Sequence, residues 1–131
     1  MRVYLSIAIG GAIGCVSRYF LASFIQQRAG PDFPLGTLVI NITGSFVLGF
    51  LMRYALQSGA ISPETRAFLT TGFCGGYTTF STYSYETALL LEDREFARAG
   101  MYVAASVGIA LIGTFLGFAV AHRLLALRQA A

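Results

Sequence analysis

The sequence predicts an all-α membrane protein with four transmembrane helices. Its composition is 56% hydrophobic and only 11% charged, with a mean hydropathy of +0.67, whereas ordinary soluble domains contain roughly 25% charged residues. Three stretches carry no charge, 35–52, 67–85 and 99–121, and each has about 18 residues or more, enough for a helix to cross a bilayer. A fourth stretch, from Val3 to about Ile25, is interrupted only by Arg18. We therefore expect residues 1–131 to form a single four-helix transmembrane domain.

Segments rich in turn-forming or charged residues connect these helices. Residues 30–34 (GPDFP) predict a turn, residues 57–65 a loop, and residues 92–95 (EDRE) a charged loop. Within the middle loop, Ser62, Pro63 and Glu64 are typical of a helix start, as the N-cap, the first-position proline and a first-turn acid. Four crossings would place the N-terminus, the middle loop and the C-terminus on one side of the membrane.

The third helix is predicted to be broken near its centre. Residues 72–83 (GFCGGYTTFSTY) combine three glycines with four serine or threonine side chains in the middle of the charge-free stretch. Glycine weakens helices, and free backbone groups are tolerated at membrane depth only where protein packs around them or where they line a watery cavity. This segment therefore indicates an ion or substrate site, and the chain a pore rather than an anchor.

Polar side chains within the helices carry the functional signal, because an unsatisfied amide or hydroxyl in hydrocarbon is costly. Asn41 lies near the centre of the second helix, where it either takes part in a site or makes an interhelical hydrogen bond. Phe80 and Tyr83 are three residues apart, so their rings share a helix face. Such a pair is usually part of a core, but here its neighbours are polar: Thr78, Thr79, Ser81, Thr82 and Ser84.

The chemistry of this track favours a small anion. Amide and hydroxyl donors and the positive edges of aromatic rings, with no carboxylate among them, suit an anion better than a cation. Arg18 is a functional candidate because it is ionisable inside a helix, although it could equally clamp carbonyl groups near a helix end. Glu86 lies roughly 9 Å beyond Phe80 along the third helix, so it is expected near a membrane interface, in an end-of-pore or a capping role.

The charges are distributed at the helix ends and form no stripe that would bind nucleic acid. All nine basic residues are arginine, and the net charge is +3. One side of the membrane would carry Arg2, Arg53, Arg66, Arg123 and Arg128, and the other Arg28, Arg94 and Arg98. Orientation follows the arginine and lysine bias of short loops, and five against three is a weak bias. The chain is therefore expected to insert in both orientations and to pair as an antiparallel dimer, the alternative being one fixed orientation with the C-terminus inside.

Three motifs resemble those of the small bacterial fluoride channels of the CrcB/Fluc type. They are residues 10–19 (GGAIGCVSRY), residues 36–45 (GTLVINITGS) and, most specifically, residues 72–82 (GFCGGYTTFST). The resemblance extends from end to end. It implies a fluoride-selective channel in the bacterial cell (inner) membrane that exports fluoride passively, and it implies an antiparallel, dual-topology homodimer with two narrow pores.

The resemblance also implies roles for individual residues. Backbone carbonyls of Gly75 and Thr78 from both subunits would hold a structural sodium ion at the dimer interface. Asn41 would donate to fluoride and Phe80 would present its ring edge. The rest of the pore lining would be Ser81, Thr82, Tyr83, Ser106 and Thr114, while Arg18 and Glu86 match polar residues of the family.

Two departures from the family pattern concern the pore. Tyr83 stands where relatives usually have phenylalanine, so it keeps a ring edge and adds a hydroxyl that needs a partner. Ala110 stands where relatives often have a second serine of the fourth-helix track, and it cannot donate a hydrogen bond. Both departures bear on how this chain would coordinate an anion.

Other function classes explain the sequence less well. A small multidrug-type dual-topology exporter would need a membrane-centred carboxylate in its first helix, and the first 31 residues contain no Asp or Glu. A structural membrane subunit would account for the G-x-x-x-G pairs at Gly10/Gly14 and Gly113/Gly117, which favour close helix packing, but not for the hydroxyl track. An enzyme is not expected, since His122 is the only histidine and no nucleotide-binding or nucleophile motif is present.

Overall fold

The computed structural model describes residues 1–58 and 61–130, and this part of the chain is helical with no strand. Three long helices are α1 (Arg2–Ala29), α2 (Leu35–Ser58) and α6 (Phe96–Ala130). Between α2 and α6 the chain forms four shorter helices: α3 (Pro63–Ala67), the π-helix η1 (Phe68–Cys74), α4 (Gly75–Tyr77) and α5 (Phe80–Glu92). The expected all-α class is confirmed.

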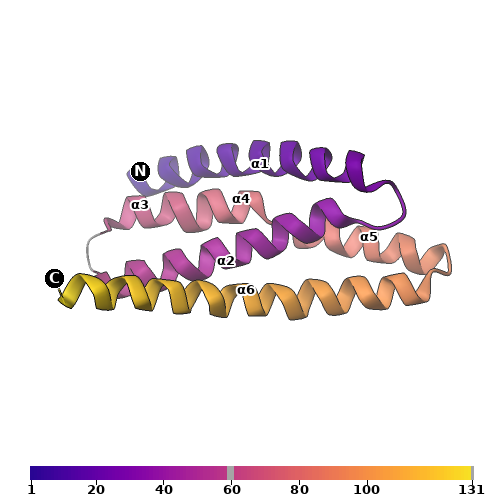
Figure 1. The fold of residues 1–131 in the computed structure, drawn as a ribbon. Coiled ribbons are helices and arrows are strands. Elements are labelled where there is room, and N and C mark those ends of the chain that lie inside the picture. Colours follow the sequence, from indigo (N-terminus) through magenta and orange to yellow (C-terminus); the bar gives the residue numbers. More distant parts are fainter. Residues whose placement is uncertain (59–60, 131) are drawn as a thin grey trace.

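The long helices lie side by side, and the shorter ones follow one another along the same length (Figure 1). α2 packs mainly against α6, α1 packs against η1 and α4, and α5 packs against α6. The start of α1, the end of α2, the start of α3 and the end of α6 lie at one end of the bundle (Figure 1), which we call the terminal end. The opposite end, with the α1–α2 and α5–α6 connections, we call the turn end.

The helices have the length and apolarity of membrane spans. α1, α2 and α6 each contain a window apolar enough to cross a bilayer, and the α3–η1–α4–α5 series makes the fourth, broken crossing. Large apolar side chains are exposed along these helices, among them Val16, Phe20, Leu111 and Phe115. A water-soluble protein would bury such side chains, so the chain is a multi-pass membrane protein.

The connections lie where the sequence indicated, with shifted boundaries. α1 continues to Ala29 rather than about Ile25 and ends at Gly30, whose φ of 85° is readily adopted by glycine. The middle loop is shorter than residues 57–65, because α2 extends to Ser58 and α3 begins at Pro63. The expected cap is confirmed, since the Ser62 hydroxyl accepts from the Thr65 N–H. α6 extends beyond residues 99–121 at both ends.

Glycines bring the helix backbones into direct contact. A Cβ atom added at Gly14 would lie 2.3 Å from the carbonyl oxygen of Phe73 in η1, and one at Gly117 would lie 2.4 Å from that of Phe46 in α2. Both distances are far inside van der Waals contact, so only glycine fits there. The expected small-residue packing therefore fixes α1 against η1 and α6 against α2, and it holds the broken crossing in place.

Candidate functional site

The helix break consists of two extended residues between α4 and α5. Thr78 has φ −90° and ψ 160°, and Thr79 has φ −152° and ψ 117°. The side chain of Asn41 in α2 bonds to the backbone of Thr79 on both sides: its Nδ2 donates to the Thr79 carbonyl at 3.0 Å, and its Oδ1 accepts from the Thr79 N–H at 2.8 Å. Asn41 thus replaces the hydrogen bonds that a continuous helix would supply, and one of its two amide hydrogens remains for another acceptor.

A second set of hydrogen bonds, made by the Thr79 side chain, completes the break. The Thr79 hydroxyl accepts from the Thr82 N–H at 3.2 Å and donates to the Thr82 hydroxyl at 3.0 Å, which makes Thr79 the N-cap of α5. The Ser81 hydroxyl lies 3.2 Å from the same Thr79 oxygen. Ser81 and Thr82 therefore organise the first turn of α5 around Thr79, which is itself buried.

The hydrogen bonds to Asn41 and to the Thr79 hydroxyl leave the carbonyl groups of Gly75 and Thr78 without the N–H donors that they would have in a helix. In an uninterrupted helix the Thr79 N–H would donate to the Gly75 carbonyl and the Thr82 N–H to the Thr78 carbonyl. Here the Thr79 N–H donates to Asn41 and the Thr82 N–H to the Thr79 hydroxyl. Oxygen atoms freed in this way at membrane depth need a cation, water or another donor. Among the described residues no group of three or more His, Cys, Asp or Glu could hold a metal ion.

A cavity of about 250 Å³ lies beside the break and gathers much of the expected pore lining. Asn41, Phe80, Tyr83 and Ser106 all line it, together with Ser45, Leu48, Thr78, Thr79 and Val107. The rings of Phe80 and Tyr83 are 5.5 Å apart between centroids, which confirms that they share a face. The Ser106 hydroxyl is buried and, within the described part of the chain, has no hydrogen-bond partner. We call this space the aromatic cavity; its lining contains no carboxylate.

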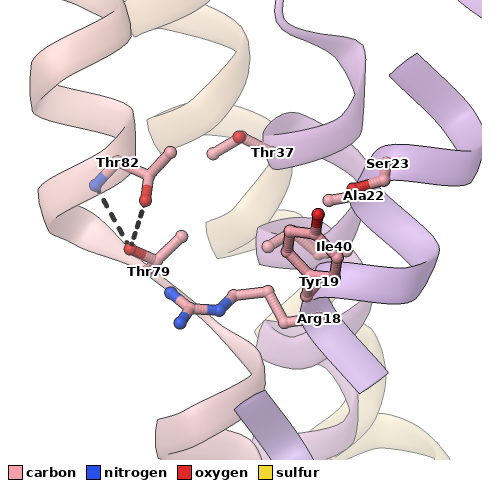
Figure 2. Close-up of a pocket in the computed structure, with 8 residues that line it drawn as sticks. All are labelled: Arg18, Tyr19, Ala22, Ser23, Thr37, Ile40, Thr79 and Thr82. Atoms are coloured by element: carbon pink, nitrogen blue, oxygen red, sulfur yellow. Dashed lines mark hydrogen bonds between the residues drawn. The ribbon is translucent and has the colours of Figure 1, made fainter. Parts of the chain in front are cut away.

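Arg18 lies in a second cavity of about 230 Å³, which Thr79 also lines. Its side chain extends from α1 towards the Thr79–Thr82 pair (Figure 2). Thr37 and Thr82 also line this cavity, and no acidic residue does. The guanidinium therefore places positive charge among hydroxyl groups. Thr79 lines both the Arg18 cavity and the aromatic cavity, so both lie next to the helix break.

Glu86 is held at the turn end by hydroxyl groups from two other helices. The Thr37 hydroxyl donates to its Oε1 at 2.8 Å, and the Tyr102 hydroxyl donates to its Oε2 at 2.6 Å. Tyr102 is fully buried, and its ring lies 5.3 Å from that of Tyr83. Glu86 thus ties α5 to α2 and α6, close to one end of the aromatic pair.

Gln26 fixes the α1–α2 connection, next to the hydrogen bonds between Glu86, Thr37 and Tyr102. Its side-chain amide donates to the carbonyls of Gly30 and Phe33, and its Oε1 accepts from the Gly36 N–H at 3.0 Å. The Gly36 N–H lies in the first turn of α2, and the N–H groups of a first turn have no acceptor within their own helix. Gln26 therefore fixes the first turn of α2, which begins at Leu35 and contains Thr37.

The remaining expected pore residues do not line the aromatic cavity. Thr114 lies between α6 and α2, where its hydroxyl donates to the carbonyls of Ala110 and Ser45 at 3.0 and 3.4 Å. Thr82 lines the Arg18 cavity, and Ser81 lines neither. The structure thus places some of the expected pore residues in the aromatic cavity, one in the Arg18 cavity, and the others in helix contacts.

Sequence reasoning missed the role of Tyr102 and the contribution of Leu48. A phenol within the apolar fourth helix needs a hydrogen-bond partner when it is buried, and this signal could have drawn attention to Tyr102. Leu48 lines the aromatic cavity because it is seven residues after Asn41 and so shares its face of α2. An apolar residue in a membrane helix gives no signal of this kind.

Comparison with known proteins identifies the family. Residues 5–118 match the family described as CrcB-like protein, Camphor Resistance (CrcB). The chain belongs to this family. It is 50% identical over 124 residues to a protein of Geobacter sulfurreducens named fluoride-specific ion channel FluC, which covers 95% of this chain and 100% of that protein.

Relatives from other organisms carry the same name. A protein of Rhizobium meliloti is 45% identical over 119 residues, covering 91% of this chain and 95% of its own length. A protein of Thermococcus gammatolerans is 43% identical over 122 residues, which cover 93% of this chain and 98% of that protein. The CrcB-like chain is therefore similar to named channels over nearly its whole length, which agrees with the prediction that it is not an enzyme.

Proposed function

We propose that the protein is a fluoride-selective channel that lets fluoride leave the bacterial cell passively. The observation that carries the proposal is the aromatic cavity: hydrogen-bond donors and ring edges, without a carboxylate, gathered beside a break in a membrane helix. The names of the relatives, fluoride-specific ion channels, support the choice of ion. Fluoride that enters a cell as the uncharged acid is trapped when it ionises, so such a channel would lower cytoplasmic fluoride.

The donors of the aromatic cavity suit a small, strongly hydrated anion. The Ser106 hydroxyl has no partner among the described residues, and Asn41 keeps one amide hydrogen after bonding to Thr79. A buried donor without an acceptor is costly, and an anion in the cavity would satisfy both. The ring edges of Phe80 and Tyr83 carry partial positive charge, so they would add favourable contacts without offering a site to a cation.

Arg18 would attract the anion before it reaches the aromatic cavity. Its guanidinium lies in a cavity that Thr37 and Thr82 also line, and its positive charge would attract an anion. Ser81 and Thr82 would act by holding Thr79 at the boundary between the two cavities. Thr114 would act by fixing α6 against the Ser45 carbonyl of α2, and Glu86 by fixing the aromatic pair at the turn end.

The working form would be an antiparallel, dual-topology homodimer with two pores. Phe80 is 79% exposed although it lines the candidate site, and Gly75 at the helix break is exposed as well. A ring edge that faces lipid can do nothing for an anion, so the site needs a second wall, which another copy of the chain would supply. The weak arginine bias would allow both orientations.

Gly75 and Thr78 fit a structural sodium ion on the two-fold axis of this dimer. The carbonyl oxygens of both residues have lost their helical donors to Asn41 and Thr79. Sodium is a hard cation that prefers oxygen ligands, and broken membrane helices bind it through freed carbonyls. Its charge would hold the two subunits together and would not take part in the transfer of fluoride.

Efflux from sealed liposomes tests the proposed function. Purified protein is reconstituted into vesicles loaded with potassium fluoride or potassium chloride, and the ion that leaves is followed with an ion-selective electrode after a potassium ionophore is added. We expect rapid fluoride efflux and no chloride efflux above that of empty vesicles. Equal efflux of both ions, or a fluoride efflux that needs a proton gradient, would refute a selective passive channel and would favour an exporter.

A further inference from the structure

An apolar groove lies between α2 and α6, on the outside of the bundle. It has a volume of about 450 Å³ and is lined by Ile42, Thr43, Phe46, Val47, Ile109, Ile112, Gly113 and Leu116. Thr43 is the only residue of this lining with a side-chain hydroxyl. That hydroxyl is 2.8 Å from the Val39 carbonyl and 3.0 Å from the Tyr77 hydroxyl, so the protein itself satisfies it. The groove therefore offers its occupant only apolar contacts.

The groove faces away from the candidate pore. Asn41 and Leu48 line the aromatic cavity, whereas Thr43 and Val47 line the groove. At about 100° per residue, Thr43 and Val47 are rotated by roughly 200° and 240° from Asn41 around the helix. A partner subunit that closes the aromatic cavity would thus leave the groove open to lipid.

One end of the groove leads to exposed arginines. α2 and α6 run in parallel, since Gly113 lies against Ile42 and Gly117 against Phe46 and then Phe50. Arg53 follows Phe46 by seven residues, and Arg123 follows Leu116 by seven residues. Residues seven apart share a helix face and are separated by roughly 10 Å along the axis. Both arginines therefore continue the two walls of the groove towards the terminal end.

Within residues 1–58 and 61–130, neither Arg53 nor Arg123 has a carboxylate partner. The one ion pair found in the described residues, Arg98–Glu95, lies at the turn end. The Arg53 guanidinium lies 5.9 Å from the Phe118 ring centroid, and Arg128 beside it donates to the Tyr54 hydroxyl. An apolar groove that ends in unpaired guanidinium groups matches a molecule with a hydrocarbon chain and an anionic head.

We propose that this groove binds an anionic phospholipid, with one acyl chain between α2 and α6 and the phosphate at Arg53 and Arg123. Basic residues between membrane helices recognise anionic lipid head groups, and guanidinium groups bind phosphate through paired hydrogen bonds. The distribution of charge selects an anionic rather than a zwitterionic lipid. The terminal end carries five arginines and, as its only acid, Glu64, whereas acidic residues are concentrated at the turn end.

Tryptophan fluorescence gives a direct test, because the chain contains no tryptophan. Ile112→Trp places the probe at the rim of the groove, and Val16→Trp places it on an exposed face of α1 near the middle of that helix. Each variant is reconstituted into equal mixtures of phosphatidylglycerol and phosphatidylcholine, in which the acyl chains of only one of the two lipids are brominated. Brominated chains quench a tryptophan that they touch.

We expect brominated phosphatidylglycerol to quench Ile112→Trp more than brominated phosphatidylcholine does, with no preference at Val16→Trp. Each arginine near a head group changes affinity by roughly fivefold, so Arg53→Gln and Arg123→Gln together should remove the preference. Arg98→Gln at the turn end should leave it intact. Equal quenching of Ile112→Trp by the two lipids, or a preference that survives loss of both arginines, would refute the site.

Native mass spectrometry of the protein without tryptophan provides a second measurement. Protein in detergent is titrated with each lipid, and the retained lipid is counted. Preferential retention of phosphatidylglycerol that falls in the Arg53→Gln, Arg123→Gln variant supports the proposal, even if Ile112→Trp fails to fold. Equal retention of both lipids by the parent protein would overturn it. Neither assay depends on fluoride transport, so the result stands apart from that of the efflux experiment.

Discussion

A single side chain, Asn41, both holds the helix break in shape and lines the aromatic cavity. Its amide makes two hydrogen bonds to the Thr79 backbone, and its second amide hydrogen remains free at the wall of the aromatic cavity. A backbone amide or carbonyl left unsatisfied in a membrane costs several kcal/mol, so these two bonds stabilise the break. The sequence left two readings of Asn41 open, and the structure establishes the interhelical hydrogen bond while leaving room for contact with an anion.

Asn41→Asp should suppress fluoride efflux. Aspartate keeps the acceptor for the Thr79 N–H but replaces the amide donor with a negatively charged oxygen, which repels an anion and leaves the Thr79 carbonyl unpaired. We expect efflux to fall by at least about tenfold, which corresponds to roughly 1.4 kcal/mol of barrier. Liposome efflux measures the rate, and size-exclusion chromatography checks assembly. Normal efflux from intact Asn41→Asp protein would show that the conduction path lies elsewhere.

The ring of Tyr83 should matter more for conduction than its hydroxyl. Tyr83→Phe keeps the ring beside Phe80 and Tyr102, so it should retain fluoride selectivity with a rate within about threefold of the parent, less than 1 kcal/mol. Tyr83→Ala removes the ring edge and should impair conduction strongly. Efflux of fluoride and chloride is compared for both variants. Loss of activity in Tyr83→Phe would mean that the phenolic hydrogen bond, rather than the ring edge, acts on the anion.

At the scale of elements, the broken crossing is positioned by the contact of α1 with η1 and α4. Gly14 meets the Phe73 carbonyl, and Gly10 meets the Phe68 carbonyl, at distances that exclude a Cβ atom. In lipid there is no hydrophobic force between helices, so close backbone packing supplies much of the attraction. The shape of the third crossing therefore depends on small residues in the first.

Gly14→Ala should destabilise the protein, while Gly11→Ala should not. A Cβ at position 14 would lie 2.3 Å from the Phe73 carbonyl oxygen, whereas at position 11 the nearest atom would be 3.9 Å away. Overpacking of this kind costs typically about 1–3 kcal/mol. Thermal unfolding of the two variants in the same detergent should show a clear drop for Gly14→Ala alone. Equal melting temperatures would indicate that α1 and η1 separate in the membrane more easily than the structure implies.

At the scale of the whole molecule, the candidate site is open on one side. Phe80, Gly75 and Ser81 are exposed at the level of the helix break, although two of them are expected to line a pore and one to bind sodium. Polar and aromatic groups of a conduction path need an enclosing wall to exclude lipid. An antiparallel second subunit would supply it, and the weak bias of the arginines would permit that arrangement.

Insertion in both orientations should be visible from labelling of the turn end. Asp93 is exposed in the α5–α6 connection, so Asp93→Cys in a Cys15→Ala, Cys74→Ala background gives one accessible thiol per chain. A membrane-impermeant maleimide added to sealed vesicles should label about half of the chains, and the rest only after the vesicles are opened, because five arginines against three are a weak orienting signal. Labelling of nearly all chains, or of almost none, before opening would exclude dual topology.

The local sequence determined the helical class, the approximate spans and the existence of the break. Charge-free stretches, the Ser62–Pro63 cap and the glycines around Thr78 act through the chain itself, by hydropathy, capping and backbone freedom. The same local signals misplaced helix ends, because arginines near an interface do not stop a helix. α6 accordingly continues well beyond the charge-free residues 99–121.

Only the tertiary structure decided which polar groups meet. Asn41 and Thr79 are 38 residues apart, and Thr37 and Glu86 are 49 apart, so no local pattern encodes their pairing. The same packing separated Thr82 and Arg18 from the cavity of Phe80 and Ser106, and it directed the Thr114 hydroxyl to the carbonyls of Ala110 and Ser45. Residue types set what each group can donate or accept, whereas helix packing, fixed by the shape of glycine contacts, sets which partner it reaches.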